Sequence, residues 1–366
     1  MIFCANPSAQ FKTYQSEIEA AVLKVMRSNQ YVLGEEVDSL EQEFASYIGV
    51  SHAIGVGNGT DALELSMRAL DIKPGDEVIT VSHTAVATVA AIESLGAIPV
   101  LVDVEQDFYT LDPAKLSEAL SQKTKAVIAV HIYGQSANLE EISNFCMQNK
   151  LFLIEDVSQA HGAKLNGARL GSIGDIATFS CYPTKNLGAI GDAGLVATKD
   201  SELAKKVKML REYGWENRYV SEFPGRNSRL DELQAAILRI KLRGLDRDNE
   251  KRRQIAKVYQ DSLTGLDLHL PQIRAGAEHV FHLYVLRCNF QKNIIEDLKK
   301  DGINLGIHYP LAVHQQNAYS NRVRTSSMEI TDQLSRQVVS LPIYPELPLS
   351  DVHQVSTAIR SWVESQ

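Results

Sequence analysis

A lysine and an aspartate in the middle of the chain could together bind an aldehyde cofactor. Lys185 lies in the run T-F-S-C-Y-P-T-K-N, and Asp156 closes the earlier apolar run L-F-L-I-E-D. A lysine amine forms a Schiff base with an aldehyde, and a carboxylate keeps a pyridine nitrogen protonated, so that the ring accepts electrons. The pair therefore predicts a site for pyridoxal 5'-phosphate (PLP), in which Lys185 and Asp156 are the catalytic residues.

A glycine-rich turn before a helix could hold the phosphate of such a cofactor. In the run G-N-G-T-D-A-L-E-L-S-M-R-A-L, the spacing of Leu63, Met67 and Leu70 predicts a helix that begins near Thr60. Free N–H groups at a helix start bind anions. An ordinary Asn-Gly turn would explain the same residues, but a strand before and a helix after favour phosphate binding. The hydroxyl of Ser180 is a second candidate ligand of the phosphate.

The neighbours of Lys185 favour a buried amine over a surface lysine, which is the ordinary alternative. Phe179 and Tyr182 are aromatic, and the glycine-rich run G-A-I-G-D-A-G follows, which would let a cofactor approach closely. Burial would lower the pKa of the lysine and favour its free amine. Gln159 could hydrogen-bond the phenolic oxygen of the cofactor, whereas His161 is expected to be a hydrogen-bonded polar residue without a direct role.

Two further segments could contact a substrate. The run Y-G-W-E-N-R-Y is aromatic and basic, which suits a nucleotide or a sugar diphosphate, although a solvated loop is a serious alternative. The run G-I-H-Y-P-L-A-V-H carries two histidines without nearby carboxylates, which makes a poor metal site, so we expect substrate hydrogen bonding and no metal. The predicted substrate-binding residues are Tyr182, Trp215, Arg218, Tyr219, His308, Tyr309 and His314.

The elements that must position these residues alternate between short apolar strands and helices. Such alternation is typical of a mainly parallel sheet covered by helices, whose ligands lie at the carboxyl ends of the strands. The first half of the chain predicts strands at Ala53–Val56, Glu77–Val81, Pro99–Val102, Ala126–Val130 and Leu151–Ile154, and helices at Tyr14–Met26, Thr60–Leu70 and Val86–Leu95.

The last third of the chain has a different pattern. A charged helix is expected over Arg229–Arg253, with Asn227 or Ser228 as its N-cap. A smaller α+β domain should follow. We therefore divide the chain into a large PLP-binding domain, residues 1–245, and a small C-terminal domain, residues 246–366. The elements expected in the second are a strand at Val280–Leu286 and helices at Asn293–Asp301 and Val352–Trp362.

Composition excludes several classes of function. The chain has 366 residues and a formal net charge of −8, without a long basic run, so nucleic acid is not an expected partner. No segment approaches the ~20 apolar residues of a membrane span, and the N-terminus shows no signal-peptide pattern. The four cysteines lack C-x-x-C spacing, which disfavours zinc. We expect reduced thiols and a cytoplasmic location.

Taken in order, the motifs resemble those of the DegT/DnrJ/EryC1/StrS family of sugar aminotransferases. The resemblance runs through nearly the whole chain. The motifs that carry it are Y-V-L-G-E-E-V, G-N-G-T-D-A-L, G-D-E-V-I-T, H-I-Y-G-Q, I-E-D-V-S-Q-A-H-G-A, F-S-C-Y-P-T-K-N, N-S-R-L-D-E-L-Q-A-A-I-L and H-Y-P-L.

This resemblance implies the aspartate aminotransferase fold (PLP-dependent transferase fold type I), with a mostly parallel seven-stranded sheet in the large domain. It also implies a homodimer with active sites at the interface, and L-glutamate as the amino donor. By motif match, Lys185 is the Schiff base lysine, Asp156 the partner of the pyridine nitrogen and Gln159 a contact of the ring oxygen. The phosphate ligands implied are Thr60, Ser180, the Gly59–Asp61 backbone and Asn227 of the other subunit.

One position departs from the family pattern. Members place an aromatic residue after the threonine in the run that reads S-H-T-A-V-A-T here, and this chain has Ala85. The usual ring-stacking side chain is therefore missing. His83 lies two residues earlier, on the same side of an extended segment, and our hypothesis is that it covers the ring.

Within the family, Y-G-W-E-N-R-Y and Q-Y-V-L-G resemble enzymes that make 3-amino-3,6-dideoxyhexoses on dTDP. Enzymes that aminate UDP-linked 3-keto-uronates share part of this pattern, and those that aminate C4 resemble it less. Related PLP-dependent dehydratases carry histidine in place of Lys185. A non-catalytic PLP-binding regulator is an alternative from a different class, but it would need a further binding module that the chain does not show.

Overall fold

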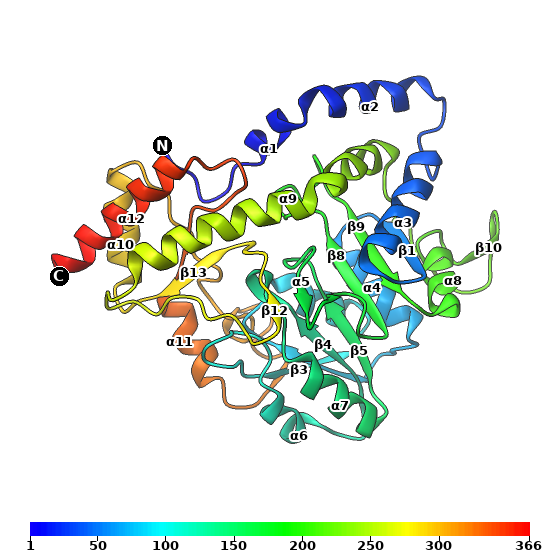
Figure 1. Cartoon of the computed structure of the whole chain (residues 1–366). Helices are drawn as coiled ribbons and strands as arrows, with labels where there is room; N and C mark the ends of the chain where they lie inside the picture. The colour runs from blue at the N-terminus through cyan, green and yellow to red at the C-terminus, as the bar shows by residue number, and fades with distance from the viewer.

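One large, mostly parallel sheet organises the computed structural model, which describes residues 1–366 (Figure 1). The strand order is β1-β9-β8-β5-β4-β2-β3-β14, and only β9 runs antiparallel to its neighbours. This arrangement confirms the expected α/β class. The strands are β1 (His52–Val56), β2 (Glu77–Val81), β3 (Ile98–Val102), β4 (Thr124–Val130), β5 (Phe152–Asp156), β8 (Ile176–Ser180), β9 (Gly194–Thr198) and β14 (Arg324–Thr325).

The sheet has one strand more than the seven that the family resemblance implies. Seven strands come from residues 52–198, as expected, and the eighth, β14, comes from the C-terminal third of the chain. It pairs in parallel with β3, where Arg324 lies opposite Val100. A strand of two residues has no readable alternation, so the sequence gives no signal for it.

Helices from the first 210 residues cover this sheet. Among the predicted helices, those at residues 60–70 and 86–95 agree with α4 and α5 to within one residue at each end. The α4 helix packs against β8 and β9, and α7 packs against β4 and β5. The bounds are α3 (Glu35–Ile48), α4 (Gly59–Ala69), α5 (Val86–Ser94), α6 (Leu116–Ala119), α7 (Leu139–Asn149), α8 (Ser201–Leu210), and the 3-10 turns η1 (Pro113–Lys115) and η2 (Ile132–Gly134).

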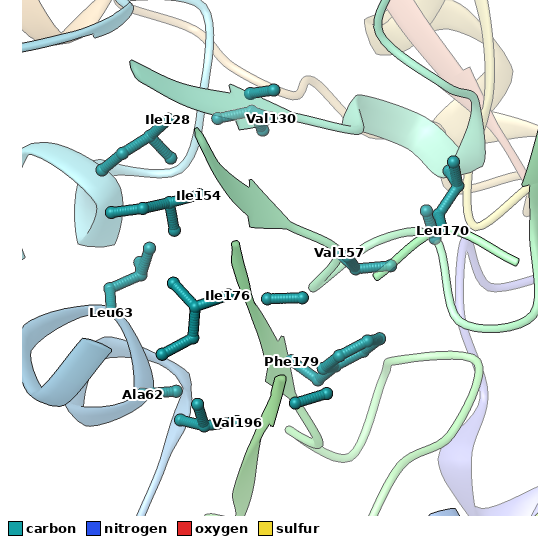
Figure 2. Close-up of a cluster of buried hydrophobic side chains, with 14 of the residues drawn as sticks. Ala62, Leu63, Ile128, Val130, Ile154, Val157, Leu170, Ile176, Phe179 and Val196 are labelled. Carbon is teal, nitrogen blue, oxygen red and sulfur yellow. The ribbon is translucent and has the colours of Figure 1, made fainter. Parts of the chain in front are cut away.

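Apolar side chains from α4 and the central strands form a continuous buried core (Figure 2). The central strands read as unbroken apolar runs because protein covers both faces of a parallel sheet. This packing fixes the strand ends at which Asp156 and Ser180 lie. The side chains labelled in Figure 2 are Ala62, Leu63, Ile128, Val130, Ile154, Val157, Leu170, Ile176, Phe179 and Val196.

A single long helix, α9 (Glu232–Leu263), connects the sheet to the C-terminal elements (Figure 1). It extends ten residues beyond the predicted end at Arg253. The predicted N-cap is wrong, because the residue at the cap position is Asp231, without a capping side-chain bond. Ser228 is instead bound elsewhere: its hydroxyl donates to the Asp61 carboxylate at 2.6 Å and accepts the Gly57 N–H at 3.0 Å.

The C-terminal elements surround a second buried apolar cluster. The predicted strand at Val280–Leu286 is only partly correct, because β13 begins at Tyr284. Phe281 has a φ of 43°, a left-handed conformation that interrupts an extended strand. The elements are β13 (Tyr284–Arg287), α10 (Gln291–Lys300), η3 (Val313–Gln315), α11 (Glu329–Gln337), β15 (Val338–Leu341) and α12 (Leu349–Glu364).

The two ends of the chain contribute to each other's packing. Ile2 pairs with Ile303 and is buried in the C-terminal cluster, and α9 passes residue 245 without a break. The division at residue 245 therefore stays a prediction. The remaining elements are α1 (Pro7–Thr13), α2 (Gln15–Arg27), β6 (Lys164–Leu165), β7 (Ala168–Arg169), β10 (Trp215–Asn217), β11 (Val220–Ser221) and β12 (Ala277–Glu278).

Two expectations from composition can be compared with the structure. None of the helices combines the length and apolar character that crossing a bilayer requires. All four cysteines are free thiols, as expected.

Candidate active site

A cavity of about 330 Å³ opens at the carboxyl ends of β5 and β8. This is where open α/β sheets bind their ligands. Fifteen of the sixteen residues that line it lie in segments singled out in the sequence, and Val130 stands beside one of them. The lining includes Asn58, Gly59, Thr60, Thr84, Ala85, Thr88, Asp156, Ser158, Gln159, Ser180, Tyr182, Lys185 and Asp192.

Lys185 lies in the loop that follows β8, as expected, and its side chain lines the cavity. A turn fixes its backbone, in which the Lys185 N–H donates to the Tyr182 carbonyl at 2.8 Å. Burial lowers the pKa of the amine to about 8, although Asp156 and, to a smaller extent, Cys181 oppose that shift. A substantial fraction of the amine is therefore unprotonated near neutral pH, as a nucleophile or proton acceptor requires.

The Asp156 carboxylate ends β5 and is 5% exposed. It accepts hydrogen bonds from the Thr88 hydroxyl and from the Ser158 N–H, each at 3.2 Å. These two donors orient the carboxylate in the cavity. Thr88 was not among the predicted residues, although it lies in the first turn of the predicted helix Val86–Leu95. Its hydroxyl is also 3.1 Å from that of Thr84, which precedes the helix.

The start of α4 lines one end of the cavity, where free backbone N–H groups could bind an anion. Asn58 caps the helix by accepting the Asp61 N–H at 2.8 Å, and Gly59 and Thr60 line the cavity. A Cβ added at Gly59 would lie 2.5 Å from the Cβ of Ser180, so no larger residue fits there. The predicted contribution of Asp61 is limited to its backbone, because its side chain binds Ser228 and lies 3.2 Å from Arg226.

Ser180 and Gln159 both line the cavity, and hydrogen bonds fix each of them. The Ser180 N–H donates to the Ser158 hydroxyl at 3.1 Å. The Gln159 amide accepts the Tyr133 N–H at 2.7 Å and donates to the Tyr309 hydroxyl at 3.0 Å. Ser158 and Tyr133 were not among the predicted residues. Two signals could have indicated them: Ser158 lies two residues after Asp156, and Tyr133 lies within the H-I-Y-G-Q motif.

His83 does not line the cavity, whereas Ala85 does. The His83 ring is 2% exposed, and its Nε2 lies 2.6 Å from the Tyr133 hydroxyl. Burial lowers the pKa of His83 to about 4, so the ring is neutral. His83 could cover a cofactor ring only if its side chain moved from this position toward the cavity. That role stays a prediction.

The predicted substrate residues fall into three places. Only Tyr182 lines the cavity around Lys185. Three others line a second cavity of about 600 Å³ beside the β10–β11 hairpin, which projects beyond α8 in Figure 1. The remaining three lie in the segment before β14, where His308 Nδ1 is 2.9 Å from the Ser340 hydroxyl and His314 Nδ1 is 2.7 Å from the Ser82 hydroxyl. The residues of the second cavity include Trp215, Arg218 and Tyr219.

Neither Asn227 nor His161 lines the cavity around Lys185. Asn227 is exposed and lines no part of the cavity of its own chain. His161 is buried, as a polar residue of the core would be, but neither of its ring nitrogens has a hydrogen-bond partner. The expectation of a hydrogen-bonded His161 is therefore wrong. Burial lowers the pKa of this histidine to about 3, with the charge of Lys185 acting in the same direction.

Comparison with known proteins settles the family. The model of the DegT/DnrJ/EryC1/StrS aminotransferase family matches residues 12–360. The chain belongs to this family. A dTDP-3-amino-3,6-dideoxy-alpha-D-galactopyranose transaminase from Aneurinibacillus thermoaerophilus is 46% identical over 349 residues, covering 95% of this chain and 96% of the relative.

Two further relatives extend this comparison. A UDP-N-acetyl-3-dehydro-alpha-D-glucosamine 3-aminotransferase from Acidithiobacillus ferrooxidans is 41% identical over 96% of this chain and 95% of its own length. The crystal structure of DesV from S. venezuelae in complex with a ketimine intermediate superimposes with a TM-score of 0.97 at 40% identity, covering 99% of this chain and 98% of that one. These matches confirm the expected aminotransferase family and fold.

Family membership also confirms PLP as the expected cofactor, and the residues of the cavity fit it. The cradle at Gly59 and Ser180 has no room for another Cβ, the Lys185 amine has a lowered pKa, and Asp156 ends a strand with two hydrogen-bond donors. In this arrangement Gly59, Thr60 and Ser180 would hold the phosphate, and Asp156 would hold the ring nitrogen.

Proposed function

We propose that this chain transfers an amino group from L-glutamate to C3 of a nucleotide-linked keto-sugar, converting dTDP-3-keto-6-deoxyhexose into dTDP-3-amino-3,6-dideoxyhexose. The observation that carries the proposal is a single cavity lined by Lys185 and Asp156, in a chain 46% identical to a transaminase of that sugar class. The 6-deoxyhexose, dTDP and glutamate parts of the proposal rest on likeness to that relative and on the family resemblance.

PLP, when bound, supplies the aldehyde that takes up the amino group and the ring that withdraws electrons. Lys185 would take a proton from the α-carbon of the amino donor in one half-reaction, and would deliver a proton to C3 of the sugar in the other. A pKa of about 8 lets the same amine accept and release a proton near neutral pH. Asp156 would keep the ring nitrogen protonated, and ping-pong kinetics should follow.

We also propose that the working form is a homodimer with shared active sites. Asn227 and the hairpin residue Tyr219 are exposed and do not line the cavity of their own chain, although their motifs match a ligand-binding pattern. A partner subunit would place them against the other cavity. Mixing inactive Lys185→Ala with inactive Asn227→Ala should restore activity, because mixed dimers contain one site with neither change; the absence of restored activity would contradict shared sites.

One alternative within the family is a UDP-linked 3-keto-sugar, a 3-keto-uronate included, as the amino acceptor. The relative that is 41% identical and acts on a UDP-linked 3-keto-sugar supports it. Amination at C4 is a second alternative. A non-catalytic PLP-binding regulator is the alternative from another class, and the 46% identity with a sugar transaminase favours catalysis instead. Turnover separates a transaminase from a protein that only binds the cofactor.

The test uses the PLP-loaded protein and its absorption spectrum. Addition of dTDP-3-amino-3,6-dideoxygalactose should remove the band of the PLP form and produce the band of pyridoxamine phosphate. A spectrum that changes only with a UDP-linked 3-amino sugar, or only with a 4-amino sugar, would replace the proposed substrate. A spectrum unchanged by every amino sugar and by L-glutamate would refute the aminotransferase reaction.

A further inference from the structure

A second polar cavity lies between the end of α9, β13 and the turn that precedes Tyr109. Its volume is about 370 Å³, within the usual range for small-molecule sites. It shares no lining residue with the cavity around Lys185, and no predicted function uses it. The side chains that could recognise a ligand there are Asp107, Tyr109, Gln260, His269, Gln272 and Arg287.

Arg287 is the unusual residue of this cavity. Its side chain is 3% exposed, yet its guanidinium forms no ion pair with any carboxylate. The single hydrogen bond of the guanidinium is a long one of 3.5 Å from Nη1 to the Gln106 carbonyl, and its Nε is buried without a partner. A guanidinium has five N–H donors, and leaving a buried charge unpaired is costly.

The other two deeply buried arginines are compensated. Arg211 also has a buried Nε without a partner, but its guanidinium forms an ion pair with Glu41. Arg252 donates to three backbone carbonyls. Neither acidic residue of the turn pairs with Arg287: Glu105 pairs with Arg274, and Asp107 forms no ion pair with Arg287. Of the three deeply buried arginines, only Arg287 has neither an ion pair nor several hydrogen bonds, and it lines this cavity.

Tyr109 supplies a second donor. Its ring is 5% exposed and lies under the Arg287 guanidinium, with the guanidinium carbon 5.8 Å from the ring centroid. Its backbone adopts a left-handed φ of 61°, and its ring also packs edge-on against His83 and Tyr133. Burial raises the pKa of the phenol to about 12, so the hydroxyl remains a hydrogen-bond donor at neutral pH.

We infer that this cavity binds a small organic anion through one carboxylate or phosphate group held by Arg287 and the Tyr109 hydroxyl. A planar guanidinium beside a neutral phenol matches the oxygens of either group. Leu263, Leu268 and Leu270 line the remainder of the cavity and would contact an apolar part of the ligand. Asp107, exposed at the same cavity, would repel the anion and limit its affinity.

The test is calorimetric titration of the PLP-loaded enzyme, whose phosphate cradle is filled, with inorganic phosphate and separately with benzoate. We expect saturable binding of at least one anion, and the stronger of the two identifies the group recognised. Arg287→Lys should weaken it about tenfold, because a point charge replaces a fork of donors. Asp107→Asn should strengthen it about threefold by removing a like charge. The control Arg274→Lys, at a residue that pairs with Glu105 of the same turn but does not line the cavity, should leave the affinity unchanged.

The outcomes separate clearly. Absence of saturable heat with both anions would overturn the inference, as would equal affinity in the wild type, Arg287→Lys and Asp107→Asn. Asp107→Asn changes an exposed residue, so its effect on the affinity keeps the test valid even if Arg287→Lys disturbs folding. Loss of binding in Arg287→Lys with normal amino transfer would place the anion at this cavity. The proposed function would stand in either case, because the two cavities share no residue.

Discussion

The lowered pKa of Lys185 predicts a measurable pH dependence of cofactor binding. A free amine is required for attack on the PLP aldehyde, and burial brings its pKa from 10.5 to about 8. At pH 7 about 9% of an amine with that pKa is unprotonated, against about 0.03% at the ordinary value, a difference of roughly 300-fold. The rate of PLP capture by the apoenzyme should therefore rise with pH and level off above about pH 8.

The charge of Asp156 makes this prediction testable by mutation. Asp156 raises the pKa of Lys185, so Asp156→Asn should lower it further and move the midpoint of capture to below pH 8. The same change removes the carboxylate that we propose holds the ring proton, so turnover should fall by at least about 100-fold, as when a preorganised charge-stabilising group is lost. Capture and turnover therefore respond differently to pH and to one substitution.

The assay is stopped-flow absorbance of PLP with apoenzyme between pH 6 and 10, divided by the rate with a simple alkylamine to remove the titration of PLP itself. Lys185→Ala provides the blank, and Lys199→Ala, at an exposed lysine, is the matched control. A normalised midpoint at 10 or higher would refute the argument that burial controls this amine. A midpoint that Asp156→Asn leaves in place would refute the electrostatic coupling.

Three more predictions follow from the site and its support. Gly59→Ala should lower PLP affinity at least tenfold in equilibrium dialysis, because the new Cβ would meet Ser180 at 2.5 Å and narrow the phosphate cradle; undiminished affinity would exclude phosphate binding there. His83→Ala should lower PLP affinity several-fold if the ring covers the cofactor, and unchanged affinity and turnover would end that hypothesis. Glu155→Gln should lower the free energy of unfolding, measured by urea denaturation, by about 3 kcal/mol. The reason is that the buried carboxylate accepts three backbone N–H groups and pairs with His131. Burial alone would raise the pKa of Glu155, but those donors hold it below 4.5, so this stabilisation is present above that pH and declines as the pH falls through the folded-state pKa; a wild-type acid transition that Glu155→Gln leaves unchanged would count against it.

The sequence predicted the centre of the site better than its surroundings. Lys185, Asp156 and Thr60 stand in local patterns, such as a strand end or a helix start, that determine where they lie. Thr88 and Tyr133 reach the site from other elements, and their contacts depend on strand order, which local patterns do not contain. The same reason explains the two-residue strand β14 and the end of α9, where tertiary packing decides the structure.

His161 shows a different limit. Its motif predicts a polar residue near the site, but the absence of any hydrogen-bond partner depends on how Phe179 and the surrounding chain pack around its ring. Burial and satisfaction of a polar atom are properties of the folded environment. Sequence patterns of this length do not specify them.

The edge strand β14 has a consequence for the order in which this protein is made. The large sheet cannot be complete until Arg324 and Thr325 have left the ribosome, because they pair with β3. Until then β3 is an unprotected edge, which invites pairing with other chains. Ile2 must likewise wait for Ile303. A nascent chain that already contains the residues of the cofactor cavity thus still lacks the edge strand of its sheet. A truncated product that ends before residue 320 should therefore aggregate instead of accumulating as a folded domain.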